Sequence, residues 1–432
     1  MIFEDYLLRQ NTHWQGKPFQ AGTRREALNR VISFLPLDQT IAITGIRRCG
    51  KSFLLKQTIN HLLQQKTDPA SILFVNLDAP PFTGKPAHEI LDPIYETFLK
   101  LKQPRGRQFL LLDEVQNLPQ WENWIKYQYD QNKGGLKFIL TGSNSQMLSS
   151  ELASRSTGRV VELALFPFSF REYLQYHDNL PLDRQVFLQQ RPAIMHLLDL
   201  YLQYGGMPEL LTVEESEARR ALLISYFDAI LYKDIIPRFS VREQGLLNDL
   251  AVLLVGASAE IVNLSRLATR FRTTRNTLRE YIDYLEKAFL LSLLQKFSFS
   301  HQTRLDSFKK CFALDTGMAN LLPILFSPDR GKLLETLVCT ELRRRHDHVF
   351  YYRDKNECDF LVQDRAGEMQ GIQVCYRLGK DNLAREIAGL TETKTNFQTG
   401  SSLLLVYEQE SELTGTSELT IQPVAEWLTL TG

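Results

Sequence analysis

The sequence has 432 residues, of which 44% are hydrophobic and 23% are charged, and these fractions are typical of a globular protein that folds in water. Its 50 Lys and Arg residues balance its 50 Asp and Glu residues, so a generally basic nucleic-acid-binding chain is excluded and only a local patch remains for such a partner. No run of about eighteen apolar residues occurs, and we therefore expect no membrane span.

The five cysteines indicate a reducing compartment. They lie at positions 49, 311, 339, 358 and 375, and they lack the spacing of zinc ligands. An odd number of cysteines also argues against a disulfide framework. We expect free, buried thiols in a cytoplasmic protein.

Short apolar runs and helical patterns alternate between residues 40 and 165, after a helical lead-in expected at 1–38. The runs predicted to be strands lie at 41–44, 72–77, 109–113, 137–142 and 160–164. Strands separated by helices predict a parallel sheet with helices on both faces. The expected fold class is therefore α/β for this part of the chain, which we bound at residues 39–168.

A phosphate-binding sequence of the form GxxxxGK[ST] joins the first predicted strand to a helix. Its residues are Gly45, Ile46, Arg47, Arg48, Cys49, Gly50, Lys51 and Ser52. Backbone N–H groups of such a loop and the helix dipole attract phosphate. Lys51 would reach the β- and γ-phosphates, and the Ser52 hydroxyl would hold Mg²⁺. The sequence predicts a nucleoside triphosphate site at this loop, with Phe53 as a further contact.

Two acids end the predicted strand at 109–113. Asp113 is placed to hold the Mg²⁺ shell, and Glu114 to orient and deprotonate the attacking water. The Asp-Glu pair favours hydrolysis. A GTPase is not favoured, because the nearest approach to its base-reading motif, at residues 132–135, lacks the Asp.

Polar and basic residues follow the next predicted strand. Ser143 and Asn144 would contact the γ-phosphate or its water, although an ordinary Asn/Ser turn is the alternative. Arg155 and Arg159 come next and would reach a phosphate in their own chain or in a neighbouring subunit, unless they are plain surface arginines.

Several segments resemble the motifs of prokaryotic AAA-type ATPases, close to the archaeal-type STAND group. They are residues 44–52, Leu112–Gln116, Leu140–Asn144, 158–170 and Tyr204–Glu209. The resemblance implies ATP as the nucleotide, a helical lid at 169–250 and Pro208 near the base. It also implies a C-terminal domain of uncharacterised function.

Residues 251–300 contain two amphipathic helical stripes that are joined by a turn at Thr273 and Thr274. This pattern is typical of a helix-turn-helix within a winged helix. Its polar face is basic, and the candidate DNA contacts are Arg272, Arg275 and Arg279. A lid or protein-contact surface is the alternative.

Residues 301–432 resemble the PD-(D/E)xK nuclease core in the order of their helix and strands. Glu335 and Asp359 match its metal-binding acids, but Gln373 and Cys375 stand where an acid and a lysine belong. An amide is a poor Mg²⁺ ligand and a thiol supplies no fixed positive charge. We therefore expect a degenerate nuclease site. The alternative is that Lys355 enters the site and takes the place of the missing lysine.

The predicted protein is an α/β ATPase with a RecA/AAA-like P-loop core, a helical lid, a winged helix and a nuclease-like C-terminal domain. It would bind ATP with Mg²⁺, hydrolyse it slowly and act as a nucleotide-dependent switch. The expected partners are DNA at the winged helix, an unidentified protein or a second copy of the chain, and no membrane. An ATP-regulated DNA nuclease and a non-hydrolysing, ATP-bound signalling scaffold are the alternatives.

Overall fold

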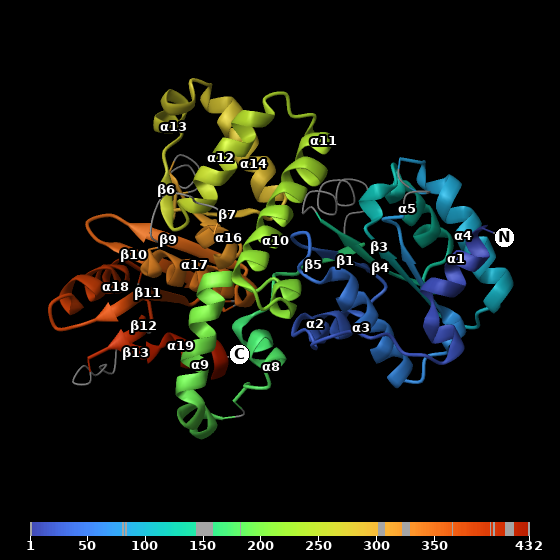
Figure 1. Cartoon of the computed structure of the whole chain (residues 1–432), viewed down its shortest axis with the longest axis horizontal. Coiled ribbons are helices and arrows are strands. Elements are labelled where there is room, and N and C mark those ends of the chain that lie inside the picture. The colour runs from blue at the N-terminus through green and yellow to red at the C-terminus, as the bar shows by residue number, and fades with distance from the viewer. Residues whose placement is uncertain are drawn as a thin grey trace. The chain divides into compact units, whose positions relative to one another are not determined.

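The computed structural model describes residues 2–79, 82, 84–143, 159–181, 183–300, 307–321, 329–364, 366–397, 399–400, 402–410 and 419–430. The chain forms two compact units, Met1–Leu165 and Phe166–Gly432 (Figure 1). All five cysteines are free and buried, as the sequence predicts. Among the residues just given, no helix is long and apolar enough to cross a membrane.

A five-stranded parallel sheet forms the centre of the first unit (Figure 1). In spatial order its strands are β2 (Ile72–Asn76), β3 (Gln108–Asp113), β4 (Leu136–Gly142), β1 (Thr40–Thr44) and β5 (Val160–Ala164). Ile41 of the central β1 lies opposite Ile139 and Val161. Apolar and β-branched residues suit strands that are buried on both faces. The predicted α/β fold and its five strands are confirmed.

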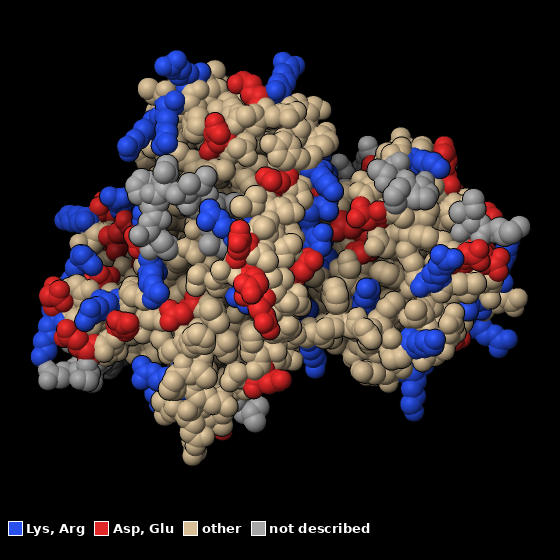
Figure 2. All heavy atoms as spheres, in the orientation of Figure 1, with Lys and Arg blue, Asp and Glu red and all other residues tan. Residues whose placement is uncertain are grey.

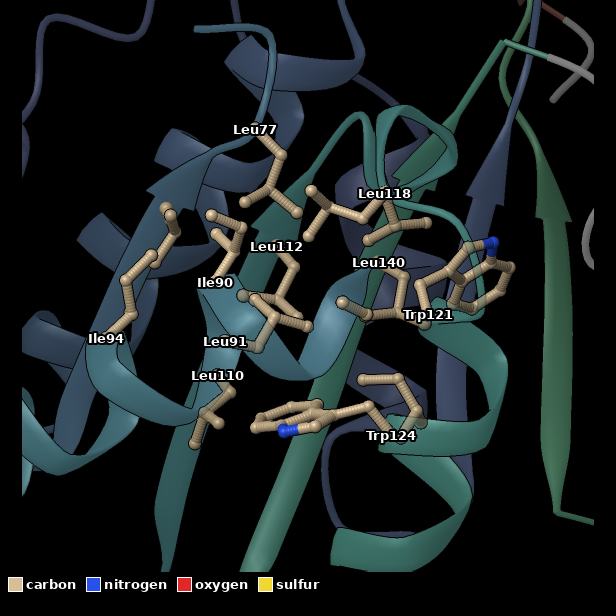
Figure 3. Packing of buried hydrophobic residues seen from close by; sticks show 14 of the residues in the cluster. Leu77, Ile90, Leu91, Ile94, Leu110, Leu112, Leu118, Trp121, Trp124 and Leu140 are labelled. Atoms are coloured by element: carbon tan, nitrogen blue, oxygen red, sulfur yellow. The ribbon is translucent and has the colours of Figure 1, made fainter. Parts of the chain in front are cut away.

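One face of this sheet is covered by α1 (Ile2–Gln10), α4 (Ala87–Lys102) and α5 (Trp121–Gln131). Figure 3 shows Leu110, Leu112 and Leu140 of the strands packed against Ile90 and Trp124 of these helices. Burial of each such side chain contributes about 2 kcal/mol to folding. This cluster fixes β3 and β4 side by side, and their carboxyl ends carry the predicted acids and the predicted sensor.

The other face is covered by α2 (Ala27–Phe34) and α3 (Lys51–Gln64). Successive strand residues point to opposite faces, so Leu111 and Ile139 face away from the first cluster. Both are fully buried, and α3 packs along β3 and β4. The helix that follows the phosphate loop is therefore anchored directly on the strands that carry the acids.

The second unit begins with helices. They are α8 (Phe170–Tyr176), α9 (Arg184–Tyr204), α10 (Ser216–Ala229), a π-helical turn (Ile230–Ile235) and α11 (Ile236–Phe239). A capping box starts α8, because the Ser169 hydroxyl accepts from the Glu172 N–H while the Glu172 carboxylate accepts from the Ser169 N–H. α9 packs against α16 (Thr316–Leu321) and α19 (Val424–Leu430). The segment predicted as a lid therefore shares its core with the C-terminal half.

A helical group with a small antiparallel sheet follows. It comprises α12 (Gln244–Gly256), β6 (Glu260–Val262), α13 (Leu264–Phe271), α14 (Arg275–Lys287), β7 (Leu291–Leu294) and β8 (Lys309–Ala313). The strands lie in the order β6-β8-β7. The Thr274 hydroxyl caps α14 by accepting from the Thr277 N–H, as the predicted turn requires. The expected boundary after residue 300 falls within this sheet, because β8 is its central strand.

The C-terminal part is a second α/β layer. Its elements are α17 (Arg330–Arg345), β9 (His348–Arg353), β10 (Glu357–Gln363), β11 (Met369–Leu378), α18 (Leu383–Phe397), β12 (Ser402–Gln409), β13 (Leu419–Pro423) and α19. The sheet order is β13-β12-β11-β10-β9, antiparallel from β9 to β11 and parallel from β11 to β13. The chain after β7 also pairs with β9, where the Phe297 N–H donates to the Tyr351 carbonyl. The two sheets of this unit are thereby joined.

Candidate nucleotide-binding site

The phosphate loop lies at the carboxyl end of β1, and α3 begins at Lys51 directly after it. Two of its glycines are required by geometry. A Cβ at Gly45 would lie 2.1 Å from the Leu165 carbonyl oxygen, and Gly50 has a φ of 100°. Larger side chains fit neither position without strain. The loop therefore has the tight backbone that a phosphate cradle needs.

Lys51 lies inside the loop with 3% of the residue exposed. Its Nζ donates to the carbonyl oxygens of Gly45 at 3.0 Å and Ile46 at 3.2 Å. The Oε1 of Glu114 lies 3.7 Å from the same ammonium. The Lys51 ammonium thus lies between the loop carbonyls and Glu114, the residue that directly follows β3.

Asp113 is fully buried at the end of β3, and only one of its two carboxylate oxygens accepts a hydrogen bond from the described residues. Its Oδ1 accepts from the Thr141 hydroxyl at 2.5 Å. Oδ2 is buried and makes no hydrogen bond within the described part of the chain. Burial raises the pKa of Asp113 to about 6, the Glu114 charge adds to the rise, and hydrogen bonds from Ser52 and Thr141 oppose it. A buried carboxylate beside the Ser52 hydroxyl is the oxygen-donor set that Mg²⁺ prefers.

Glu114 adopts a left-handed backbone conformation, with a φ of 57°. Such a conformation costs a non-glycine residue about 1–3 kcal/mol, so surrounding contacts must hold it in place. Its N–H donates to the Thr141 hydroxyl oxygen at 2.9 Å, and its Oε2 accepts from the Gln116 side-chain amide. The Glu114 side chain is 20% exposed and lies beside the Lys51 ammonium.

Thr141 and Gln116 are the site residues to which sequence reasoning gave no role. Thr141 joins both acids, because its hydroxyl donates to Asp113 and accepts from the Glu114 N–H. Gln116 joins Glu114 to the Ser143 hydroxyl, 3.3 Å from its Nε2. Both lie within segments that resemble family motifs, and that was the available signal.

The remaining loop residues differ in burial. Ile46 and Cys49 are buried, and burial raises the pKa of the Cys49 thiol. Arg48 is exposed and Arg47 is half-buried. Phe53 is 48% exposed on the first turn of α3, which leaves its ring accessible.

Arg25 supports the loop from the preceding segment. This buried side chain donates from Nη1 to the Cys49 carbonyl oxygen at 2.6 Å. The Arg25 N–H donates to the Gln57 side chain of α3 at 2.9 Å. The sequence gave no signal for this contact, since Arg25 lies outside every motif.

The arginines after β4 do not join the phosphate loop in the described structure. Arg159 precedes β5 at the amino edge of the sheet, where its carbonyl accepts from the Thr40 N–H, whereas the loop lies at the carboxyl edge. Its guanidinium pairs with Asp130 at 2.7 Å. A phosphate contact within the same chain is therefore not supported for Arg159. Asn144 and Arg155 lie outside the described residues.

The segment that contains Pro208 has a packing role in the second unit. The Gly206 N–H donates to Asp315 Oδ2 at 2.8 Å. A Cβ at Gly205 would lie 1.9 Å from Asp315 Oδ1, and one at Gly317 would lie 2.1 Å from the Tyr204 carbonyl oxygen. These glycines allow the segment to approach α16 closely.

The predicted nuclease-like acids surround a lysine from β8. Lys310 Nζ lies 2.7 Å from Glu335, 2.8 Å from Glu357 and 3.5 Å from Asp359. Burial alone would lower the pKa of the Lys310 ammonium, but the three carboxylates outweigh it and raise that pKa. Burial and the Asp359 charge raise the pKa of Glu335. Lys355 is not part of this group, and its N–H donates to Glu392.

Gln373 and Cys375, the two positions that depart from the nuclease pattern, both lie on β11. The Gln373 side chain accepts from the Asp359 N–H at 3.1 Å and donates to Glu386 at 3.3 Å. Asp359 Oδ2 accepts from the Val374 N–H at 3.0 Å. Burial raises the pKa of the Cys375 thiol to about 11. Nowhere in the described residues do three or more His, Cys, Asp or Glu side chains form a group that could hold a metal ion.

Arginines cluster on the surface of α13, α14 and the turn between them. The five arginines are Arg266, Arg270, Arg272, Arg275 and Arg279. Each is exposed, and none forms an ion pair within the described residues. Figure 2 shows basic side chains projecting from the molecule around α13. The exposed positive charges of this patch are accessible to an anionic partner.

Three family models match the chain. One is described as an AAA domain and matches residues 37–174. The other two are described as domains of unknown function and match residues 195–329 and 330–427. The AAA match contains every residue predicted for the phosphate loop and the two acids.

Two relatives are similar to this chain over most of its length. An uncharacterised protein of Methanocaldococcus jannaschii is 30% identical over 398 residues, which cover 90% of this chain and 84% of that protein. An uncharacterised protein of Haemophilus influenzae is 28% identical over 418 residues, which cover 94% of this chain and 98% of that protein. The similarity therefore extends over both units.

Two solved structures also match. The Aeropyrum pernix ORC1 protein in complex with DNA is 14% identical, with 76% of this chain and 96% of that chain covered and a TM-score of 0.32. AMPPCP-bound DnaA from Aquifex aeolicus is 17% identical, with 63% and 90% covered and a TM-score of 0.29. At such TM-scores neither match bears on the function of this chain.

Proposed function

This chain belongs to the same family as the Methanocaldococcus jannaschii protein, and its residues 37–174 match an AAA domain; from that premise we propose that it binds Mg-ATP at residues 45–53. We propose further that it hydrolyses ATP slowly and thereby switches its affinity for a DNA or protein partner in the cytoplasm. The bound nucleotide, ATP or ADP, would determine whether the chain binds its partner.

The single observation that carries the proposal is the buried, half-satisfied carboxylate of Asp113 beside the phosphate loop. An unpaired buried oxygen of this kind is costly unless a ligand engages it. Ser52 and Asp113 would hold Mg²⁺, which supplies charge neutralisation of the phosphates when it is bound.

The chain's own residues supply the remaining chemistry. The Lys51 ammonium, which now donates to loop carbonyls, would gain stronger charge-assisted bonds from the β- and γ-phosphates. Backbone N–H groups of residues 45–50 would bind the phosphate oxygens. Glu114 would accept a proton from the attacking water, and Ser143 would lie within reach of that water or the γ-phosphate.

Substitution of Lys51 tests nucleotide binding. Lys51→Ala should weaken ATP binding by about a hundredfold, or about 3 kcal/mol, because the point charge on the phosphates is lost. Isothermal titration calorimetry with Mg-ATP measures the change, and the exposed Lys100→Ala is the matched control. Undiminished binding by Lys51→Ala would overturn the assignment.

Substitution of Glu114 tests hydrolysis. Glu114→Gln preserves shape but removes the base, so the variant should retain ATP without releasing phosphate. If phosphate release is unchanged, the base lies elsewhere. If the wild-type protein itself retains ATP without turnover, the non-hydrolysing scaffold replaces the ATPase.

The exposed arginines of α13, α14 and the turn between them favour DNA as a second partner. The order of α12, β6, α13, α14, β7 and β8 is that of a winged helix, and the basic turn would meet the phosphate backbone at the start of α14. Arginine–phosphate contacts release counterions, so binding of a DNA duplex should fall steeply with added salt.

A mobility-shift titration with a DNA duplex over a salt series tests this partner. Replacement of Arg272, Arg275 and Arg279 by Ala should reduce both the affinity and its salt dependence. Lys100→Ala should leave both unchanged. If the wild-type protein shifts no DNA at low salt, the surface is a protein contact.

A further inference from the structure

We propose that Gln116 orients the attacking water together with Glu114, an inference that rests on the proposed ATPase function. Gln116 lies in the short 3₁₀ turn Val115–Asn117 that follows β3 and the left-handed Glu114. The turn brings its side chain back over the carboxyl edge of the sheet. There its amide contacts Glu114 and the Ser143 hydroxyl.

The orientation of the Gln116 amide follows from its neighbours. Its Nε2 donates to the Glu114 carboxylate, which only accepts, and lies 3.3 Å from Ser143 Oγ. The NH₂ group must therefore face Glu114. This leaves the carbonyl oxygen Oε1 as the free end of the side chain.

Oε1 of Gln116 is buried and accepts no hydrogen bond within the described residues. A buried acceptor without a donor costs about 1–3 kcal/mol. The site therefore contains an unused acceptor next to the carboxylate proposed as the general base. A water molecule between them would donate one hydrogen to each group, and its lone pair would then be fixed in direction.

Hydrolysis at this site requires only ATP and one water molecule as reactants. The water oxygen forms a bond to the γ-phosphorus, and the bond from that phosphorus to the β–γ bridging oxygen breaks. The electron pair of the broken bond leaves with ADP, and the water proton passes to the Glu114 carboxylate. Gln116 exchanges no proton, so its contribution is alignment of the water.

The test separates turnover from binding. Gln116→Ala should lower kcat by about ten- to a hundredfold while the Kd for Mg-ATP stays unchanged, because only the water loses a contact. Gln116→Met, which retains the length of the side chain without its polar atoms, should behave in the same way. The matched control is Asn117→Ala, since Asn117 lies in the same turn but donates to Leu77 and Asp78.

The outcomes distinguish this inference from the proposed function. Wild-type turnover in both Gln116 variants, with Glu114→Gln inactive, would overturn the role of Gln116 and leave the ATPase intact. Equal losses in Asn117→Ala, or a weakened Kd in the Gln116 variants, would show that the turn acts structurally and would also overturn it. An inactive wild-type protein would refute hydrolysis and this inference together, whereas the Lys51 titration would still report ATP binding.

Discussion

The Thr141 hydroxyl makes hydrogen bonds to both of the adjacent acids, Asp113 and Glu114. Its oxygen accepts from the Glu114 N–H while its hydrogen goes to Asp113, so the threonine sets both the left-handed backbone and the orientation of the buried carboxylate. The other oxygen of Asp113, Oδ2, makes no hydrogen bond within the described residues. A residue with no chemistry of its own thereby shapes the predicted site.

Thr141→Val should remove both hydrogen bonds with little change in volume. We expect turnover to fall by at least about tenfold, because second-layer contacts of this kind orient the groups that bind the metal. The loss of a bond to a carboxylate should also cost about 2 kcal/mol of stability. Steady-state kinetics and urea unfolding measure the two effects. Thr141→Ser retains the hydroxyl and is the control, so equal behaviour of Val and Ser would contradict this role.

At the scale of elements, α16 is joined to the 204–208 segment by Asp315. This buried carboxylate accepts from the N–H groups of Gly206, Gly317 and Met318. Burial raises the pKa of Asp315 from 3.8 to about 6, and these hydrogen bonds only partly oppose the rise. The junction therefore contains an acid that is more easily protonated in the folded chain than in the unfolded chain.

The stability of this junction should depend on pH with a definite sign. Because the folded state binds the proton more tightly, the free energy of unfolding should fall as pH rises from about 4 to about 6, by up to about 3 kcal/mol, and should be level above that range. Asp315→Asn lacks the ionising group and should lack this fall. Urea unfolding of both proteins across the range measures the difference, and parallel curves would argue against the assignment.

At the scale of the molecule, Lys310 connects parts of the second unit that are distant in sequence. It lies on the central strand of the small sheet and binds carboxylates from α17 and β10. A buried ammonium among carboxylates satisfies charges that would otherwise be costly. The group that resembles a nuclease site is therefore closed by a lysine of the chain itself.

Lys310→Met should lower the free energy of unfolding of the full-length protein by about 3–5 kcal/mol, because it leaves three neighbouring carboxylates without the ammonium that they share. Lys332→Met removes an exposed pair with Glu260 and should cost less than about 1 kcal/mol. Urea unfolding compares the two variants. If both variants lose the same small amount of unfolding free energy, Lys310 contributes no more to stability than an exposed ion pair does.

The same arrangement predicts that the wild-type protein does not cut plasmid DNA with Mg²⁺ or Mn²⁺, since the ammonium fills the space between the acids. Cleavage that is lost in Asp359→Ala would contradict this expectation and would favour the ATP-regulated nuclease.

The sequence by itself determined the features that depend on neighbours along the chain. The GxxxxGK[ST] loop, the apolar strands with Asp113 and Glu114 at the end of one of them, and the capped helix after Thr274 are local patterns, and local backbone chemistry is enough to predict them. In the C-terminal part α17, the strands β9 to β12 and α19 were readable for the same reason, whereas α18 and β13 were not predicted. Their proposed catalytic and binding roles remain predictions.

Only the tertiary structure decided which distant side chains meet. Lys310 reaches Glu335 and Asp359 across long separations in sequence, and Arg25 reaches the phosphate loop from a segment without a motif. Arg159 follows β4 in the sequence, yet it lies at the edge of the sheet opposite the phosphate loop and pairs with Asp130. Such contacts depend on strand order and on the packing of whole elements, and periodicity along one chain carries no information about either.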